Sequence, residues 1–407
     1  MPLTDANRDS HPAGRPGEVF GAFLKLGLTA FGGPVAHLGY MRDEFVQRRG
    51  WLDDARFAQL LAICQFLPGP ASSQLGFAIG LLRGGWRGAL CAFVGFTLPS
   101  ALLMFGFALL APTLGSGLGA GVLHGLKLVA VAVVAHALVG MVRSLAPDLP
   151  RALIAVAAAA LLLWAGGAWM QLATIALGAA LGAWWCRQMR PPAGAPLVAP
   201  GGARLGVACL ALFLAGLLAT LLLPASGTPG VAPLASAFYQ AGALVFGGGH
   251  VVLPLLQHTV VDSGWVGRDT FLAGYGAAQA VPGPMFSLAA FLGAEVPLGW
   301  PAALGATVAL LAIFLPGFLL LLAVLPSWAR LSRHRLAGGT VAGVNAAVLG
   351  LLAAAFYDPV WTQGVRTPAD LAIAAVGFGL LALARLPALW AVLWCVAASM
   401  GLHLVWL

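Results

Sequence analysis

Long apolar stretches alternate with short polar segments along almost the whole chain. Leu205–Leu223, Ala302–Leu325 and Leu389–Leu407 each contain no Asp, Glu, Lys or Arg. Each fits the length of about 20 residues that an α-helix needs to cross a bilayer. The polar segment 1–17 has no short apolar run followed by a cleavage site, so we expect no cleaved signal peptide. The pattern predicts an all-α polytopic membrane protein.

The composition supports this class and excludes others. Of 407 residues, 60% are hydrophobic and only 8% are charged, whereas soluble domains carry about a quarter charged residues. The net charge of +8 is spread over loops and is not interleaved with exposed aromatic residues, which argues against nucleic-acid binding. The cysteines lie far apart in apolar segments, so we expect packing roles, with no disulfide, no metal site and no cofactor. They are Cys64, Cys91, Cys186, Cys209 and Cys395.

Two helix-breaking motifs occur together twice in the chain. The first copy is Phe31-Gly32-Gly33-Pro34 with Pro68-Gly69-Pro70, and the second is Phe246-Gly247-Gly248-Gly249 with Pro282-Gly283-Pro284. Without gaps, residues 51–80 and 265–294 agree at eight positions, including all of Pro-Gly-Pro. Corresponding breaks in the two halves of a membrane protein indicate the binding site of a transporter.

The repeat divides the chain into four parts. We expect a cytoplasmic N-terminal segment at 1–17, a first repeat at 18–190, a linker with one extra span at 191–230, and a second repeat at 231–407. Each repeat should begin with two broken pairs of short helices, followed by four further helical segments. The predicted pairs are Glu18–Arg49, Leu52–Leu82, 232–262 and 268–295. The later segments are 86–111, 117–146, 151–165, 168–187, 299–326, 337–357, 367–384 and 387–406.

Basic loops alternate between the halves. Arg83 and Arg87 follow the first Pro-Gly-Pro element, and the matching stretch of the second half has no basic residue. Arginines lie between two spans of the second half at 330–335, where the first half has none. Because positive loops stay cytoplasmic, the halves should be inserted in opposite senses. We expect a cytoplasmic N-terminus and a periplasmic C-terminus, with the extra span causing the inversion.

The Pro-Gly-Pro elements are the expected chemical sites. Proline lacks an N–H and clashes with the preceding turn, so each element must interrupt a helix. A second helix can begin at Pro70 or Pro284, because proline suits the first helical position. Irregular backbone at membrane depth survives only inside protein or beside a wet cavity. A helix N-terminus there offers unpaired N–H groups and a partial positive charge, which suits an anion.

At these residues the chain resembles the two-domain members of the chromate ion transporter family. The resemblance rests on Phe31–Pro34, Gly50-Trp51-Leu52 and Gln65–Pro70, with second copies at Phe246–Gly249 and Gln279–Pro284. It implies secondary export of chromate from the bacterial cytoplasm across the inner membrane, driven by the proton-motive force, and chromate resistance. It also implies two homologous halves of opposed topology. One departure is Gly249 where the first copy has Pro34.

The expected substrate-binding residues lie in or beside the two motif pairs. Gln65 and Gln279 precede the two Pro-Gly-Pro elements, where an amide can bond freed backbone or a bound oxyanion. His250 directly follows the second glycine run and can titrate in a useful range. The full set is Phe31, Gly32, Gly33, Gln65, Pro68, Gly69, Pro70, Ser72, Ser73, Lys127, Gly247, Gly248, Gly249, His250, Gln279, Pro282, Gly283, Pro284 and Ser287.

A few charged or polar residues lie inside apolar segments. Lys127 must be paired, deprotonated or facing water, which favours a role as substrate counter-charge or in coupling. Lys25 either snorkels to the interface or places a positive charge over the anion site. Arg83 anchors a cytoplasmic loop or steers a dianion to the inner mouth. Glu295 is an interfacial acid or a proton-coupling group, and Asn345 is a further coupling candidate.

Three functional classes can be compared. The chain carries no nucleophile–base pair and no metal-ligand cluster of the kind a membrane enzyme needs, so we expect no enzyme. The sequence does not discriminate a carrier of chromate from a carrier of another oxyanion such as sulfate, or from a passive anion channel. The expected partners are the oxyanion and the lipid bilayer, with no nucleic acid. A homodimer is left open.

Overall fold

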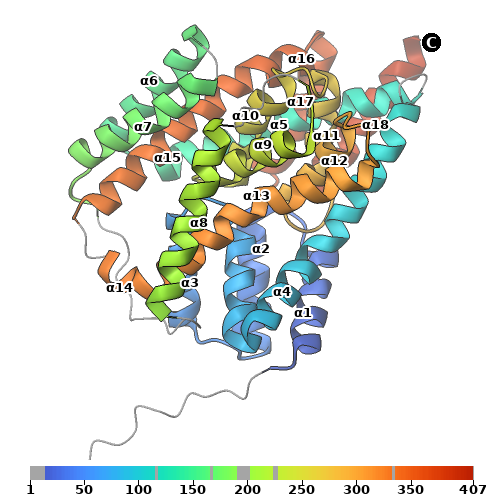
Figure 1. Ribbon diagram of the computed structural model, residues 1–407. Helices are drawn as coiled ribbons and strands as arrows, with labels where there is room; N and C mark the ends of the chain where they lie inside the picture. Colours follow the sequence, from blue (N-terminus) through green and yellow to red (C-terminus); the bar gives the residue numbers. More distant parts are fainter. Residues whose placement is uncertain are drawn as a thin grey trace, which may run out of the picture.

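The computed structural model describes residues 14–114, 118–165, 168–189, 202–222, 228–331 and 335–406. Within these ranges all regular structure is helical and no strand occurs (Figure 1). Some sequence predictions concern residues outside these ranges, namely most of the N-terminal segment, the linker at 190–201, and Arg333.

In its described residues the first half contains seven α-helices, and one of them, α4, is long and broken. A π-helical segment η1 follows α2, and a 3₁₀ turn η2 follows α4. Although α4 is continuous in hydrogen bonding, Gly84 and Gly85 leave helical angles and divide it at the predicted position. The bounds are α1 (Pro16–Thr29), α2 (Gly33–Arg42), η1 (Asp43–Arg48), α3 (Asp54–Phe66), α4 (Ala71–Leu110), η2 (Ala111–Leu114), α5 (Leu118–Leu145), α6 (Leu149–Ala165) and α7 (Ala168–Trp185).

The extra span α8 (Gly202–Leu222) separates the two halves and lies on the outside of the molecule against α9 and α13. The elements after α8 form the second half, which contains more short helical segments than the first. Its bounds are α9 (Val231–Leu244), η3 (Gly249–Val251), α10 (Val252–Leu256), η4 (Gln257–Val261), α11 (Arg268–Ala278), η5 (Met285–Ser287), α12 (Leu288–Glu295), α13 (Ala302–Val324), η6 (Leu325–Ser327), α14 (Trp328–Leu331), α15 (Arg335–Ala355), η7 (Phe356–Trp361), α16 (Thr362–Gly364), α17 (Pro368–Ala382) and α18 (Ala388–Trp406).

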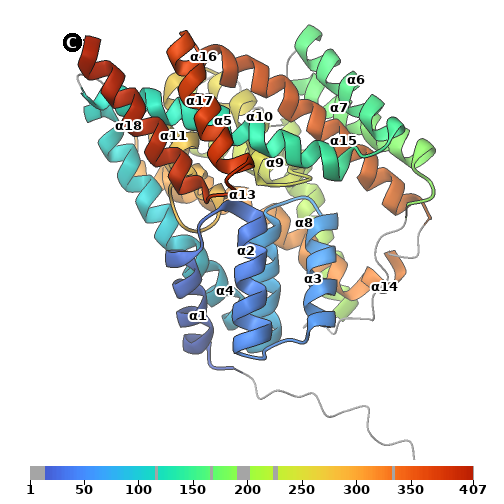
Figure 2. The ribbon, with the colours of Figure 1, turned by 180° about the vertical axis from the view of Figure 1, so that it is seen from behind.

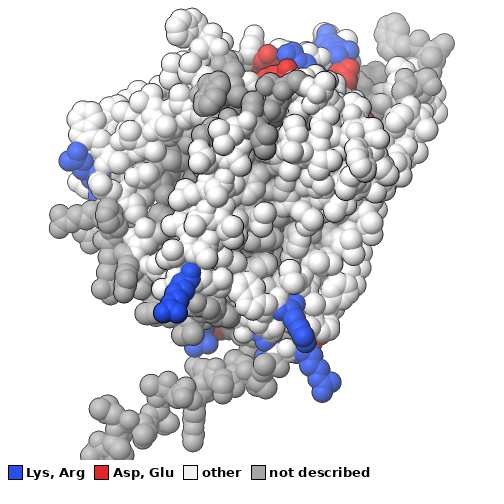
Figure 3. All heavy atoms as spheres, in the orientation of Figure 1, with Lys and Arg blue, Asp and Glu red and all other residues white. Residues whose placement is uncertain are grey.

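The helices make a multi-pass membrane protein. Five helical stretches among the described residues are long and apolar enough to cross a bilayer, and several shorter apolar helices accompany them. On the face drawn in Figure 3, most charged side chains lie near the upper and lower ends, with a largely uncharged surface between them. The prediction of an all-α polytopic membrane protein is therefore confirmed.

Late helices of each half pack against the other half. Helix α5 packs on α17 and α18, and α15 packs on α6 and α7 (Figure 2). Glycines allow this close approach, as is common between membrane helices. A β-carbon at Gly125 would lie 2.6 Å from the Val396 α-carbon, and one at Gly343 would lie 2.0 Å from the Gly178 carbonyl oxygen.

Two proline-containing helices meet in the middle of the molecule. The second part of α4 carries Pro99 and α13 carries Pro316, and each proline deprives its helix of one backbone bond. Phenylalanine rings join them: Phe93 contacts Phe314 with ring centroids 5.1 Å apart, and Phe77 stacks on Phe318 at 4.5 Å. These contacts hold α13 against both parts of α4, with Phe77 before the break at Gly84 and Phe93 after it.

The Gly343 contact gives a stability prediction. In Gly343→Ala the new β-carbon forces α15 away from α7, and overpacking of this kind costs about 1–3 kcal/mol. The midpoint of thermal unfolding of the solubilised protein should fall by several degrees. In the control Gly379→Ala the β-carbon meets nothing within 4 Å, so its midpoint should not fall. Equal midpoints for the two variants would contradict the packing described for α7 and α15.

Candidate anion site between the two broken elements

Each Pro-Gly-Pro element ends one helix and begins another. In the first half α3 ends at Phe66 and α4 begins at Ala71. In the second half α11 ends at Ala278, and a 3₁₀ turn from Met285 leads into α12. Gly69 and Gly283 have φ angles of 119° and 101°, a region that other residues enter only with strain. The glycine between the prolines is therefore what lets the chain turn.

The helix ends after the breaks have no side-chain caps. Pro70 and Pro284 occupy the N-cap positions and no side chain accepts from the first N–H groups. Ser72, Ser73 and Ser287 lie in these first turns and are buried. Uncapped N–H groups inside a protein carry the partial positive charge of the helix end. Both ends thus offer donors in buried surroundings.

The two halves hold each other's breaks by matching backbone hydrogen bonds. The Gly69 N–H donates to the Val245 carbonyl at 2.7 Å, and the Gly283 N–H donates to the Ala30 carbonyl at 2.9 Å. Val245 and Ala30 are the residues directly before Phe246 and Phe31, where the two Phe-Gly-Gly segments begin. Each Pro-Gly-Pro element is therefore joined to the Phe-Gly-Gly segment of the other half.

Each glycine of a break also touches the proline-kinked helix of the other half. A β-carbon at Gly69 would lie 2.9 Å from the Gly317 α-carbon, and one at Gly283 would lie 3.0 Å from Ser100 Oγ. Gln74 Nε2 donates to the Pro68 carbonyl at 3.0 Å and to the Gly317 carbonyl at 2.9 Å. In the matching position of the second half stands an apolar residue, Leu288.

The Phe-Gly-Gly segments lie between α1 and α2 and between α9 and η3. Gly32 is exposed, and Phe31, Gly33, Phe246, Gly247 and Gly248 are half-buried. Gly249 is buried in the 3₁₀ turn η3, whereas α2 begins with Gly33. Asn345 of α15 lies beside the second segment, because a β-carbon at Gly247 would be 3.5 Å from Asn345 Oδ1. The segments are therefore not equivalent in burial.

Two histidines flank this region. The His37 Nε2 atom lies 3.1 Å from the Ala30 carbonyl, the same oxygen that receives Gly283 N–H. His250 Nδ1 lies 2.7 Å from the Tyr275 hydroxyl. His37 therefore contacts the same carbonyl that binds the second break, and His250 connects the second glycine run to α11.

The two glutamines before the breaks differ. Gln65 is exposed at the end of α3, whereas Gln279 is buried and its Nε2 lies 3.2 Å from Met285 Sδ. Helix α11 packs on α5, where a β-carbon at Gly276 would lie 2.0 Å from the Leu126 carbonyl oxygen. Helix α3 packs chiefly on α4. Corresponding helices thus have different neighbours in the two halves.

Several buried polar atoms of the central helices have no hydrogen-bond partner among the described residues. They are Ser73 Oγ, Gln74 Oε1, Thr97 Oγ1 and Asn345 Oδ1. Such groups are rare in folded proteins, because leaving them unpaired costs about 1–3 kcal/mol. Gln74 and Thr97 were missed at the sequence level. Two sequence signals could have identified them: Gln74 lies in the first turn after a break, and Thr97 lies two residues before Pro99.

The candidate cations near the first break are paired with acids. Lys25 Nζ contacts Glu44 Oε2 at 3.0 Å, and Arg49 Nε contacts Glu44 Oε1 at 2.8 Å. The Glu44 side chain is only 5% exposed. Arg83 lies 3.5 Å from Glu18 and its guanidinium carbon lies 5.2 Å from the Trp51 ring. Lys25 therefore anchors α1 to a buried carboxylate on η1.

Lys127 lies in a charged cavity of about 590 Å3 that Glu295 also lines. Its Nζ is 2.7 Å from Asp269 Oδ1 at the start of α11. This cavity begins at the opposite end of α11 from Gln279 and the second break. The structure thus places Asp269, the partner of Lys127, at the far end of α11 from the second break, and Glu295 at the far end of α12.

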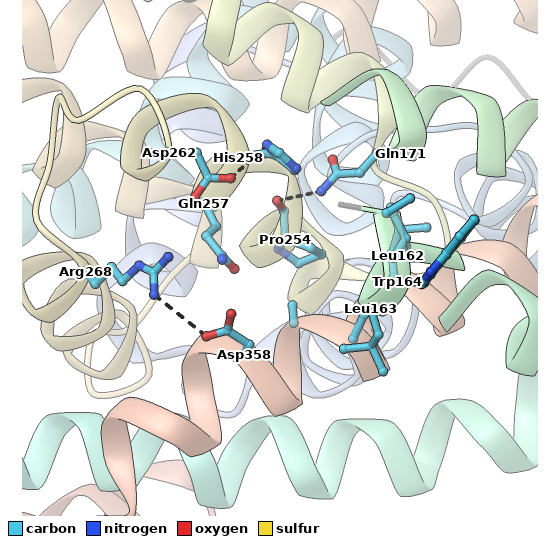
Figure 4. A pocket seen from close by; sticks show the side chains of 14 residues that line it. Leu162, Leu163, Trp164, Gln171, Pro254, Gln257, His258, Asp262, Arg268 and Asp358 are labelled. Carbon is cyan, nitrogen blue, oxygen red and sulfur yellow. Dashed lines mark hydrogen bonds and ion pairs between the residues drawn. The ribbon is translucent and has the colours of Figure 1, made fainter. Parts of the chain in front are cut away.

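A second polar cavity, of about 380 Å3, lies on another side of α11. Figure 4 shows Arg268 pointing toward Asp358 of η7, with Nη1 and Oδ1 3.9 Å apart, and Asp262 beside His258 at 2.9 Å. Gln171 of α7 reaches the Pro254 carbonyl at 3.3 Å. Neighbouring residues at the start of α11, Arg268 and Asp269, therefore enter two different cavities.

The helical fold and the broken helices are those of a polytopic membrane protein with discontinuous helices, a feature that many transporters share. The sequence model of a family described as "Chromate transporter" matches this chain twice, over residues 17–183 and 232–402. The chain therefore belongs to the chromate transporter family. No solved structure matches it.

Curated relatives cover most of the chain. It is 29% identical to the "Chromate transport protein" of Pseudomonas aeruginosa, over 89% of this chain and 86% of the relative. It is 30% identical to the "Probable chromate transport protein" of Synechococcus elongatus, over 87% of each. It is also 30% identical to the "Chromate transport protein" of Cupriavidus metallidurans, over 82% and 80%.

The contacts of Gly69 and Gly283 predict a local effect of substitution. In Gly69→Ala or Gly283→Ala the left-handed angle costs roughly 1–2 kcal/mol, and the methyl group pushes against Gly317 or Ser100. Membrane insertion should persist while transport in vesicles falls strongly. The control Gly106→Ala, whose β-carbon meets nothing within 4 Å, should transport normally. Normal transport by both break variants would contradict the assignment.

Proposed function

We propose that this protein is a secondary active exporter of chromate, a tetrahedral oxyanion, and that the anion binds where the two broken elements meet. The observation that carries the proposal is the matched pair of bonds from Gly69 to Val245 and from Gly283 to Ala30. The names of the family and of the relatives supply the substrate.

This region can bind an anion although it has no formally charged side chain at its centre. Two buried helix N-termini lie beside each other's partner segments, and their free N–H groups attract negative charge. Hydroxyl groups of Ser73 and Thr97 are buried with no hydrogen-bond partner in the part of the chain that the structure describes, and they can donate to an oxyanion oxygen. Binding by dipoles holds an anion less tightly than an ion pair does, which suits a substrate that must also leave.

An inverted repeat accounts for the exchange of contacts between the halves. In each half, the glycine of the break donates its N–H to a backbone carbonyl of the other half. Helices α5 and α15 each pack on the last helices of the opposite half. A two-fold axis in the membrane plane produces this pattern. The two separate matches of the family sequence model support the boundaries 18–190 and 231–407 as the repeats.

The unequal surroundings of α3 and α11 support alternating access. Helix α11 is packed on α5, while α3 packs chiefly on α4 and leaves Gln65 exposed. If α3 and α11 exchange these surroundings, the site between the two breaks opens first to one side of the membrane and then to the other. We propose that α3 and α11 are the elements that move, and that the proton-motive force drives the cycle.

We propose that transport is outward, and the basic loops give the orientation of the protein in the membrane. With the basic first loop inside, α1 begins on the cytoplasmic side of the inner membrane. The end of α18 lies at the opposite end of the molecule from α1 (Figure 1), so the C-terminus is periplasmic. Export in this orientation confers chromate resistance. A homodimer stays a prediction that these observations do not bear on.

A topology measurement tests the orientation. A compartment reporter fused after Leu407 should be active in the periplasm, whereas one fused before Pro16 should be active in the cytoplasm. Both fusions should support the same expression level. A cytoplasmic signal from the C-terminal fusion would contradict both the proposed count of spans and the inverted repeat.

Uptake into everted membrane vesicles tests the function. Radiolabelled chromate should accumulate in energised vesicles with saturation, and a protonophore should abolish accumulation. Vesicles with the Gly69→Ala/Gly283→Ala variant serve as the matched control. Linear uptake that ignores the protonophore would favour a passive channel. Uptake of sulfate but not chromate would assign the alternative oxyanion, and no uptake of either by competent vesicles would reject the proposal.

A further inference from the structure

Two cations share one carboxylate oxygen at the start of α11. Asp269 Oδ1 lies 2.7 Å from Lys127 Nζ and 3.6 Å from Arg366 Nη2. The Lys127 side chain is 9% exposed, whereas that of Asp269 is 59% exposed. A buried ammonium group requires an anionic partner, and Asp269 reaches in from the helix end to supply it.

The cavity around this cluster has room for a small hydrated anion. Its volume of about 590 Å3 compares with about 30 Å3 for one water molecule in the liquid. Helices α5, α11, α12 and α18 line it, and its wall includes His124, Thr270, Ala273, Phe291, Glu295 and His403. Both shared cations line the cavity as well.

We infer that this cavity is a second oxyanion site, in which Asp269 occupies the place of the anion when the anion is absent. A carboxylate oxygen and an oxyanion oxygen use the same donors from Lys and Arg. A divalent oxyanion entering the cavity would take Lys127 and Arg366 as ligands and displace the Asp269 carboxylate toward solvent. This inference rests on the proposed function, since it takes the transported oxyanion as the ligand.

The nearby acid Asp370 is engaged by other donors. Asp370 is already bound by His124 Nε2 at 2.6 Å and by the backbone N–H groups of Arg366 and Thr367 at 3.1 and 2.9 Å. It therefore does not compete for the side chain of Arg366. Glu295 on α12 lines the same cavity.

The site is connected to the second break by α11. Asp269 lies in the first turn of this helix and Gln279 follows its last residue, which corresponds to roughly 15 Å along the axis at 1.5 Å per residue. Release of Asp269 from Lys127 removes one of the ion pairs that fix the start of α11. The Arg268–Asp358 pair in the neighbouring cavity remains (Figure 4).

Equilibrium binding of radiolabelled sulfate and chromate to the purified protein in nanodiscs tests the inference. The measurement uses the Gly69→Ala/Gly283→Ala background, so that the proposed site between the breaks contributes as little as possible to the measured binding. Asp269→Asn removes the competing carboxylate, and oxyanion affinity should rise roughly tenfold, the ratio that corresponds to about 1.4 kcal/mol. Adding Lys127→Gln should abolish the gain.

The matched control is Asp358→Asn, which removes an acid from the adjacent ion pair in the other cavity. It should leave oxyanion affinity unchanged. No gain in Asp269→Asn, an equal gain in Asp358→Asn, or a gain that survives Lys127→Gln would each show an ordinary structural ion pair and overturn the inference. If the parent protein transports no oxyanion but Asp269→Asn gains Lys127-dependent binding, the proposed function fails and the second site stands.

Discussion

The backbone bond between each Pro-Gly-Pro glycine and the other half's carbonyl is the constraint on which the rest of the structure depends. A chain that breaks its helix within apolar surroundings must find partners for the freed groups, because no water is there to provide them. Gly69 and Gly283 find theirs at Val245 and Ala30. Neither half can satisfy its own break in this way, so the two halves must assemble face to face.

Charge is distributed away from this crossing. Near the breaks the available groups are backbone N–H groups, hydroxyls and amides. Formal charges lie in separate clusters: Lys25 and Arg49 contact Glu44 in one, and Lys127 and Arg366 share Asp269 in another. Under the proposed function, an anion would meet full charges on its way and weaker dipoles at the centre, which would lower the barrier to leaving.

The sequence predicted the helices well and their partners only in part. The breaks at Pro68–Pro70 and Pro282–Pro284 and the division of α4 near Gly84 follow from local backbone chemistry, which proline and glycine determine wherever they stand. The bond from Gln74 to Gly317 and the pair of Lys127 with Asp269 join residues far apart in the chain. No periodicity encodes such contacts. Gln65 and Gln279 looked equivalent in sequence, but the different neighbours of α3 and α11 give them different exposure.

Locating the bound substrate tests the central claim most directly. Chromium scatters X-rays anomalously, so a crystal of the protein grown with chromate, measured at the chromium edge, would give the position of the metal atom without ambiguity. The account predicts a peak between the helix ends that begin at Ala71 and Met285, within reach of Ser73. A peak in the Lys127 cavity with none at the crossing, or peaks only at the surface, would contradict it.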